Sequence, residues 1–139
     1  HWREAIETGC EHLHLGQEDL DQADLAAIRA AGIQIGISTH DQAELNRAIH
    51  CQADSIALGP IFPTHSKDLS WQAQGLSKIT DWKRQIGTRP LIAIGGIVFE
   101  SAPAVLQAGA DAIAVIGDIA NHSNPLARCQ QWLALTDPV

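Results

Sequence analysis

The sequence predicts an α/β fold built around a parallel sheet. Five short apolar segments recur along the 139 residues, and several are apolar throughout instead of alternating with polar positions. Strands of this kind are typical of a sheet that is covered on both faces, as parallel sheets are. Segments with helical spacing separate them, and this regular alternation indicates repeated β-α units.

The expected strands are the segments richest in Ile, Val and Leu. They occupy residues 12–16, 33–38, 55–62, 91–95 and 112–116. A weak internal repeat relates residues 53–59 to residues 110–117, and each copy begins with an Ala-Asp pair where a helix returns to the sheet. Ligands bind at the opposite, carboxyl ends of parallel strands, so Asp54 and Asp111 are expected to be structural.

Helix ends can be read between these strands. Asp21 is expected to cap a helix that ends before Gly32, and Thr39 with Gln42 has the spacing of a capping box. A third helix is expected over residues 76–86. The fourth helix is expected to have Pro103 in its first turn. The last helix is expected to begin at Asn124-Pro125, with Leu126, Cys129 and Leu133 along one face.

Composition excludes several functions. Acidic residues outnumber basic ones by 16 to 9 without a basic, aromatic-rich patch, so no nucleic-acid partner is expected. No apolar run approaches the roughly 20 residues of a membrane span. The cysteines Cys10, Cys51 and Cys129 lie far apart, which favours reduced thiols in a cytoplasmic protein. The chain begins with His1 in helix-like sequence, so it is expected to be part of something longer.

The first loop on the expected ligand side contains two adjacent carboxylates, Glu18 and Asp19, after a glycine. One of them can serve as a ligand for Mg²⁺, which takes one or two protein carboxylates and completes its shell with water and phosphate oxygens. The alternative is that both are solvated charges that precede a helix.

The second loop contains Ser38, Thr39 and His40. A serine close to a histidine suggests nucleophilic catalysis, but the G-x-S-x-G elbow is absent. We therefore favour a phosphate-binding hydroxyl for Ser38, at the start of a helix. His12 and His14 face the same side of a strand and could ligate a metal, although packing against the sheet is favoured.

The third loop, residues 59–67, is the most informative segment. It presents Thr64, Ser66 and Lys67 within four residues, and hydroxyls beside an ammonium suit a phosphate or diphosphate ester. A basic residue on a solvated loop is the alternative. Glycines that allow close approach to an anion follow the last two strands, as Gly95-Gly96 and Gly117.

Together these segments resemble the thiamine phosphate synthase family. The resemblance rests on residues 13–20, 36–40, 56–67, 93–97, 108–111 and 113–116, in order and at the family's spacing. It implies a TIM (β/α)8-barrel fold of which this chain covers about the last five β/α units. Residues 1–139 would then form a partial barrel domain that lacks the N-terminal strands.

The resemblance also implies an activity and a site. The family is a transferase of thiamine biosynthesis that condenses hydroxymethylpyrimidine diphosphate with thiazole phosphate, using Mg²⁺, and releases diphosphate. It assigns Asp19 to the metal, and Ser38 and Lys67 to catalysis and the pyrimidine diphosphate. The thiazole phosphate would be held by Thr64, His65, Ser66, Gly96, Ile116 and Gly117.

The chain departs from the family in two ways. Gly117 stands where the family usually has Ser, so a hydroxyl to the thiazole phosphate is lost. The missing strands should leave an exposed apolar interior and an inactive fragment, and a homo-oligomer is possible. The alternatives are a thiazole tautomerase, which the presence of Asp19 and Pro60 disfavours, and a non-catalytic phosphate-binding remnant.

Overall fold

The computed structural model describes residues 1–64 and 71–136 and confirms the α/β prediction. Five strands form one parallel sheet in sequence order: β1 (His12–Leu15), β2 (Gln34–Thr39), β3 (Ser55–Leu58), β4 (Leu91–Ile94) and β5 (Ala112–Ala114). Among the described residues, β1 and β5 each pair on one side only. The sheet therefore has two edges within this part of the chain.

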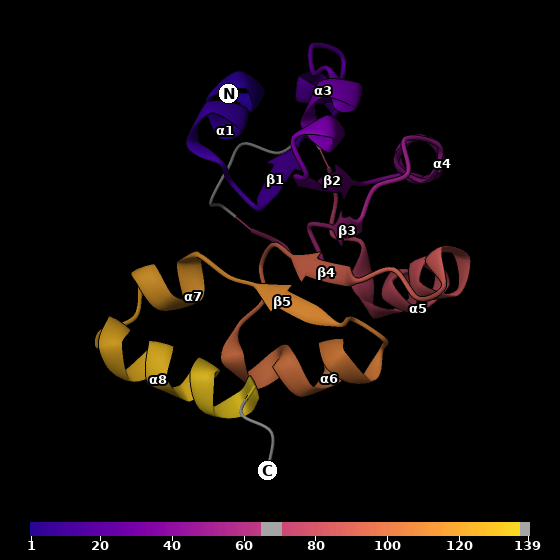
Figure 1. Cartoon of the computed structure of the whole chain (residues 1–139). Helices are drawn as coiled ribbons and strands as arrows, with labels where there is room; N and C mark the ends of the chain where they lie inside the picture. The colour runs from indigo at the N-terminus through magenta and orange to yellow at the C-terminus, as the bar shows by residue number, and fades with distance from the viewer. Residues whose placement is uncertain (65–70, 137–139) are drawn as a thin grey trace.

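The helices are α1 (Trp2–Thr8), α2 (Gln17–Leu20), α3 (Leu25–Ala30), α4 (Gln42–His50), α5 (Gly75–Ile86), α6 (Ala102–Gln107), α7 (Gly117–Ala120) and α8 (Pro125–Thr136), with a 3₁₀ turn, η1 (Phe99–Ser101), before α6. The first precedes β1, the last two follow β5, and the others connect successive strands; α3 to α6 lie along one side of the sheet (Figure 1). Within residues 1–64 and 71–136, none of these helices has the length and apolar character needed to cross a bilayer.

The two faces of the sheet differ in character. The face toward the helices is mostly apolar, with Ile35, Ile37, Ile56 and Leu58 fully buried at its centre. The register places another row, in which His14, Gly36 and Ser55 are neighbours, on the opposite face. That row is polar, so the expectation of an apolar uncovered interior is wrong for β1 to β3.

The apolar part of this second face lies on β4. Ile92 and Ile94 are half-buried there, and Ile92 is in register with the small residues Ala57 and Ala112. The uncovered face therefore changes from polar to apolar across the sheet.

The sequence predicts that Asp21 caps the first helix after β1, but an additional short helix lies there and the cap is a different residue. The carboxylate of Asp24, not Asp21, accepts the Ala27 N–H at 3.0 Å and begins α3. Asp21 instead ends α2 and pairs with Arg47 of α4 at 2.5 Å. The four-residue α2 was not expected, and it uses the residues before Asp21.

The cap of α4 is also different from the expected one. Asp41 accepts the Glu44 N–H at 2.9 Å, whereas Thr39 is fully buried within β2. The Thr39 hydroxyl donates to the Ala57 carbonyl at 2.9 Å and accepts from the Trp82 Nε1–H at 3.0 Å. Tertiary partners thus draw Thr39 into the sheet, and the helix begins two residues later.

Asp54 and Asp111 are structural, as expected from the internal repeat. Asp54 donates its N–H to the Ile35 carbonyl at 2.8 Å and accepts the Ile35 N–H at 2.7 Å. Asp111 makes the same pair of bonds with Leu91, at 2.9 and 2.7 Å. Each aspartate therefore fastens the start of one strand to the strand before it.

The final helix begins at Pro125 as expected but buries a different face. Leu126 and Leu133 are 71% and 61% exposed, whereas Trp132 is buried. The indole N–H of Trp132 donates to the Asp118 carboxylate at 2.8 Å, which ties α8 to α7. The apolar pattern alone did not reveal this polar anchor.

We expect Asp111→Ala to destabilise the protein by about 1–2 kcal/mol at neutral pH, because the Leu91 N–H and the Lys83 ammonium lose their acceptor. The value is modest because the Asp111 side chain is 43% exposed. Urea unfolding measures it. Asp81→Ala is the control, since Asp81 is 61% exposed and pairs only loosely with Arg84, and it should change stability by less than about 0.5 kcal/mol.

The difference in unfolding free energy between the wild type and Asp111→Ala should depend on pH. Partial desolvation raises the pKa of Asp111, but hydrogen bonds from Lys83 and from the Leu91 N–H outweigh it and hold the pKa below its ordinary value of 3.8. The stabilisation is therefore complete above pH 3.8 and is lost as the pH falls through the lowered pKa. A wild-type advantage that persists unchanged in strong acid would contradict this origin.

Candidate active site

The residues expected to bind ligand gather at the carboxyl edge of the sheet, because all five strands run in the same direction. Each of the described ones ends a strand or follows one closely: Asp19 after β1, Ser38 in β2, Thr64 after β3, Gly96 after β4, and Ile116 and Gly117 after β5. His65, Ser66 and Lys67 lie outside the described residues.

Helix α2 is docked onto the end of β2 by Gln17, which sequence reasoning missed. The Gln17 amide donates to the Ser38 carbonyl at 2.7 Å. Arg47 in turn donates to the Gln17 backbone and side-chain oxygens at 3.3 and 3.4 Å. This chain of bonds holds Asp19 and Ser38 on neighbouring elements, and the amide directly after Gly16 was its only sequence signal.

Asp19 occupies the exposed first turn of α2. One carboxylate oxygen accepts the Gly16 N–H at 3.2 Å, and the other has no hydrogen-bond partner among the described residues. In that part of the chain, no three His, Cys, Asp or Glu side chains cluster as a metal site would require. One available carboxylate nevertheless fits Mg²⁺, which needs only one or two from the protein.

His14 contacts Ser38 directly across the β1–β2 pair. Its Nε2 lies 2.8 Å from the Ser38 Oγ, and its ring lies over Gly36, where a Cβ would be 2.7 Å from Nδ1. Although the side chain is exposed, partial desolvation by the surrounding protein lowers the pKa of His14 from its ordinary value of 6.5, which favours a neutral ring at neutral pH. His14 contacts the sheet at Gly36, as the favoured expectation has it, but its side chain is exposed and Ser38 is an unexpected polar partner.

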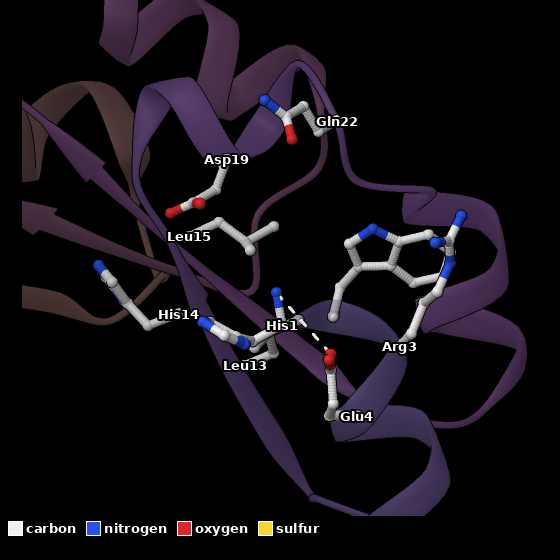
Figure 2. Close-up of a pocket in the computed structure, with 9 residues that line it drawn as sticks. His1, Arg3, Glu4, Leu13, His14, Leu15, Asp19 and Gln22 are labelled. Atoms are coloured by element: carbon white, nitrogen blue, oxygen red, sulfur yellow. Dashed lines mark ion pairs between the residues drawn. The ribbon is translucent and has the colours of Figure 1, made fainter.

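A hollow of about 390 Å³ lies beside His14 at the β1 edge. Side chains from α1, β1 and α2 line it, and Figure 2 shows the Asp19 carboxylate and the His14 ring pointing to the same side of it. The polar groups of α2 and β1 therefore share one open space.

The segment that carries Thr64 is fastened to the end of β4 through its backbone. The Ile61 N–H donates to the Ile94 carbonyl at 2.9 Å, and the Phe62 N–H donates to the Gly95 carbonyl at 3.1 Å. β3 itself ends at Leu58, four residues earlier than expected, because Pro60 has no N–H to continue the ladder.

This attachment requires glycine at two positions. Gly95 and Gly96 have φ of +85° and +69°, and a Cβ on Gly95 would lie 2.7 Å from the Pro60 Cα. A Cβ on Gly96 would collide with the Phe62 carbonyl oxygen and lie 2.6 Å from that of Pro63. The double glycine thus permits a close backbone approach, here by the neighbouring segment.

The end of β5 is held in place from the C-terminal helix. Gly117 begins α7, and Ile116 before it is 72% exposed. The next residue, Asp118, has a side chain only 5% exposed that accepts from Trp132 at 2.8 Å and lies 3.4 Å from the Arg128 Nε. Asp118 and Trp132 hold α7 against α8 directly after residues 116–117, and no short-range pattern pairs these two side chains.

This arrangement is characteristic of one class of protein. A parallel sheet with outer helices carries its hydroxyl, carboxylate and glycine positions at the carboxyl edge. Enzymes of α/β type that bind phosphorylated small molecules are built in this way.

The chain belongs to the thiamine monophosphate synthase family, whose model matches residues 1–119. It is 53% identical over 138 residues to the thiamine-phosphate synthase of Rhizobium etli, and 47% identical over 137 residues to that of Neisseria meningitidis. These matches cover 99% of this chain and 68% and 67% of the relatives. The chain therefore spans about two thirds of their length.

A solved structure shows the same fold. The thiamine phosphate pyrophosphorylase of Pyrococcus furiosus superposes with a TM-score of 0.80 at 25% identity, over 97% of this chain and 63% of that one. The family expected from the sequence is thus confirmed, and the fold prediction agrees with this neighbour.

We expect Gly96→Ala to destabilise the protein far more than Gly9→Ala, its matched control. The two glycines have φ of +69° and +67°, but nothing lies within 4 Å of a Cβ at Gly9. The control should cost about 1–2 kcal/mol from backbone strain alone. Gly96→Ala should cost about 1–3 kcal/mol more in urea unfolding, because the 60–63 backbone must move. Equal losses would show that the close approach is unimportant.

Proposed function

We propose that this chain carries part of a thiamine phosphate synthase site, with groups for both the thiazole phosphate and the pyrimidine diphosphate. The complete protein would condense hydroxymethylpyrimidine diphosphate with thiazole phosphate to give thiamine phosphate and diphosphate. The observation that carries the proposal is the fixed grouping of Asp19, Ser38, Gly96 and Gly117 at one sheet edge. It occurs in a chain 53% identical to a relative named thiamine-phosphate synthase.

Each described residue has a specific role in this proposal. The Ser38 hydroxyl would donate to the pyrimidine diphosphate. Thr64, the Gly96 backbone and the backbone of Ile116 and Gly117 would hold the thiazole phosphate. Backbone N–H groups and hydroxyls suit this role because they donate hydrogen bonds, and the oxygens of an ionised phosphate ester accept them.

The chemistry proposed is a dissociative substitution. As diphosphate leaves, the pyrimidine methylene becomes cationic and negative charge gathers on the departing group. By family resemblance, Lys67 would stabilise that charge, with His65 and Ser66 at the thiazole phosphate. No protein nucleophile is needed, because the thiazole nitrogen attacks the methylene and electrostatic stabilisation of the leaving group lowers the barrier.

Mg²⁺ is the proposed cofactor, and Asp19 would hold it through the carboxylate oxygen that is not used by Gly16. When bound, the ion would neutralise charge on the diphosphate. The bond from Gly16 already fixes the Asp19 side chain at the start of α2, so Asp19 could bind the ion without a change in the helix.

Small-molecule substrates of this kind are consistent with a cytoplasmic biosynthetic enzyme, and we propose that location. A homo-oligomer is compatible with the two sheet edges of the described chain. Neither nucleic acid nor membrane enters the proposed activity.

We expect these 139 residues alone to lack detectable synthase activity, because the sheet has two edges in the described residues and the chain spans about two thirds of its relatives. A coupled assay for thiamine phosphate, with both substrates and Mg²⁺, measures this. Adding the N-terminal third of the Rhizobium etli relative in trans should restore activity. Normal rates from the chain alone would contradict the prediction.

We expect Gly117→Ser to tighten thiazole phosphate binding by about three- to tenfold, because it adds a hydroxyl donor beside the proposed phosphate site. Gly117→Ala is the matched control, since it adds a Cβ without a donor, and calorimetry measures both. The dephosphorylated thiazole alcohol should bind equally to all three proteins. Equal affinity for the phosphate and the alcohol would reject the phosphate site.

The second candidate function is that of a thiazole tautomerase. If the protein isomerised a thiazole carboxylate phosphate without Mg²⁺, that function would replace the synthase proposal.

A further inference from the structure

Ser38 is held from two directions by residues of neighbouring elements. Its carbonyl accepts from the Gln17 amide at 2.7 Å, and its Oγ lies 2.8 Å from the His14 Nε2. The first bond fixes the backbone, and the second fixes the direction of the hydroxyl. The proposed function uses the hydroxyl but assigns nothing to His14.

The direction of the His14–Ser38 hydrogen bond decides what Ser38 can do. A serine hydroxyl has one proton to donate and two lone pairs to accept with, whereas an ionised phosphate oxygen only accepts. If His14 accepted the Ser38 proton, none would be left for the phosphate. If His14 donates from Nε2, the Ser38 proton is free to point at the ligand.

The structure holds the His14 ring where it can act in this way. His14 and Gly36 are partners in the β1–β2 register, and a Cβ at Gly36 would lie 2.7 Å from Nδ1 and 2.9 Å from the Ser55 Oγ. Any larger residue at position 36 would therefore displace the ring. Glycine at position 36 leaves the space that brings Nε2 to Ser38.

We propose that His14 is a positioning residue: its Nε2–H donates to the Ser38 Oγ and directs the Ser38 hydroxyl proton to a phosphate oxygen of the ligand. This inference rests on the proposed function, because it takes Ser38 to be a ligand of the diphosphate. His14 itself does not touch the ligand. Its effect on affinity must therefore pass through Ser38.

A double-mutant cycle with inorganic pyrophosphate and Mg²⁺ as the probe tests this route. The variants are His14→Phe, Ser38→Ala and the double mutant, with calorimetry giving each Kd and urea unfolding confirming that each variant folds. His14→Phe should weaken binding about three- to tenfold in the wild-type background and less than twofold in the Ser38→Ala background. His14→Gln should bind within about twofold of wild type, because its amide N–H can replace the Nε2–H.

The outcomes separate this inference from the proposed function. Unchanged binding by Ser38→Ala would reject the role of Ser38 and, with it, the inference. Weaker binding by Ser38→Ala but not by His14→Phe would overturn the inference alone, as would an equal loss for His14→Phe in both backgrounds. Long-range ¹H–¹⁵N NMR of the His14 ring decides the point where binding is too weak for calorimetry: a proton on Nε2 supports the inference, and a proton on Nδ1 overturns it.

Discussion

The carboxyl edge of the sheet, where the candidate site lies, depends on one backbone contact, the approach of residues 60–63 to Gly95 and Gly96. Two hydrogen bonds, from Ile61 and Phe62 to the end of β4, hold the segments together, and no side chain fits between them. A contact of this kind has little freedom to adjust, because a carbonyl oxygen cannot rotate away as the end of a side chain can. The position of Thr64, at the end of this segment, therefore follows from two glycines on another strand.

The amino ends of the strands, opposite the candidate site, are fixed in a different way. Asp54 and Asp111 each close a pair of hydrogen bonds with the preceding strand, at positions that are equivalent in the internal repeat. These clamps use charge and are partly open to solvent, so a substitution there costs stability without moving the ligand side. Stability and function are thus supported at separate ends of the same strands, which is the arrangement expected of parallel β/α enzymes.

Much of this could be predicted because the signals are local. Apolar runs, Pro103 at the start of α6 and the Asn124-Pro125 pair depend only on near neighbours in the sequence, and the two structural aspartates were found through the repeat. The errors have tertiary causes. Thr39 resembles a cap until Ala57 and Trp82 supply better partners. In the same way, no sequence pattern pairs Asp118 with Trp132, or His14 with Ser38, because those contacts join elements that only the folded sheet brings together.

The uncovered face of the sheet connects these constraints to the chemistry. Polar side chains lie on β1 to β3 of that face, near His14 and Ser38, and apolar ones lie on β4. A hydrogen bond between neutral groups has more influence where water is excluded, since water can replace either partner on an open surface. The His14–Ser38 bond lies on the exposed part of the sheet in this chain, so its control over the hydroxyl should be strongest when further protein covers β1. The influence of this polar row on a ligand therefore depends on how far water is excluded from it.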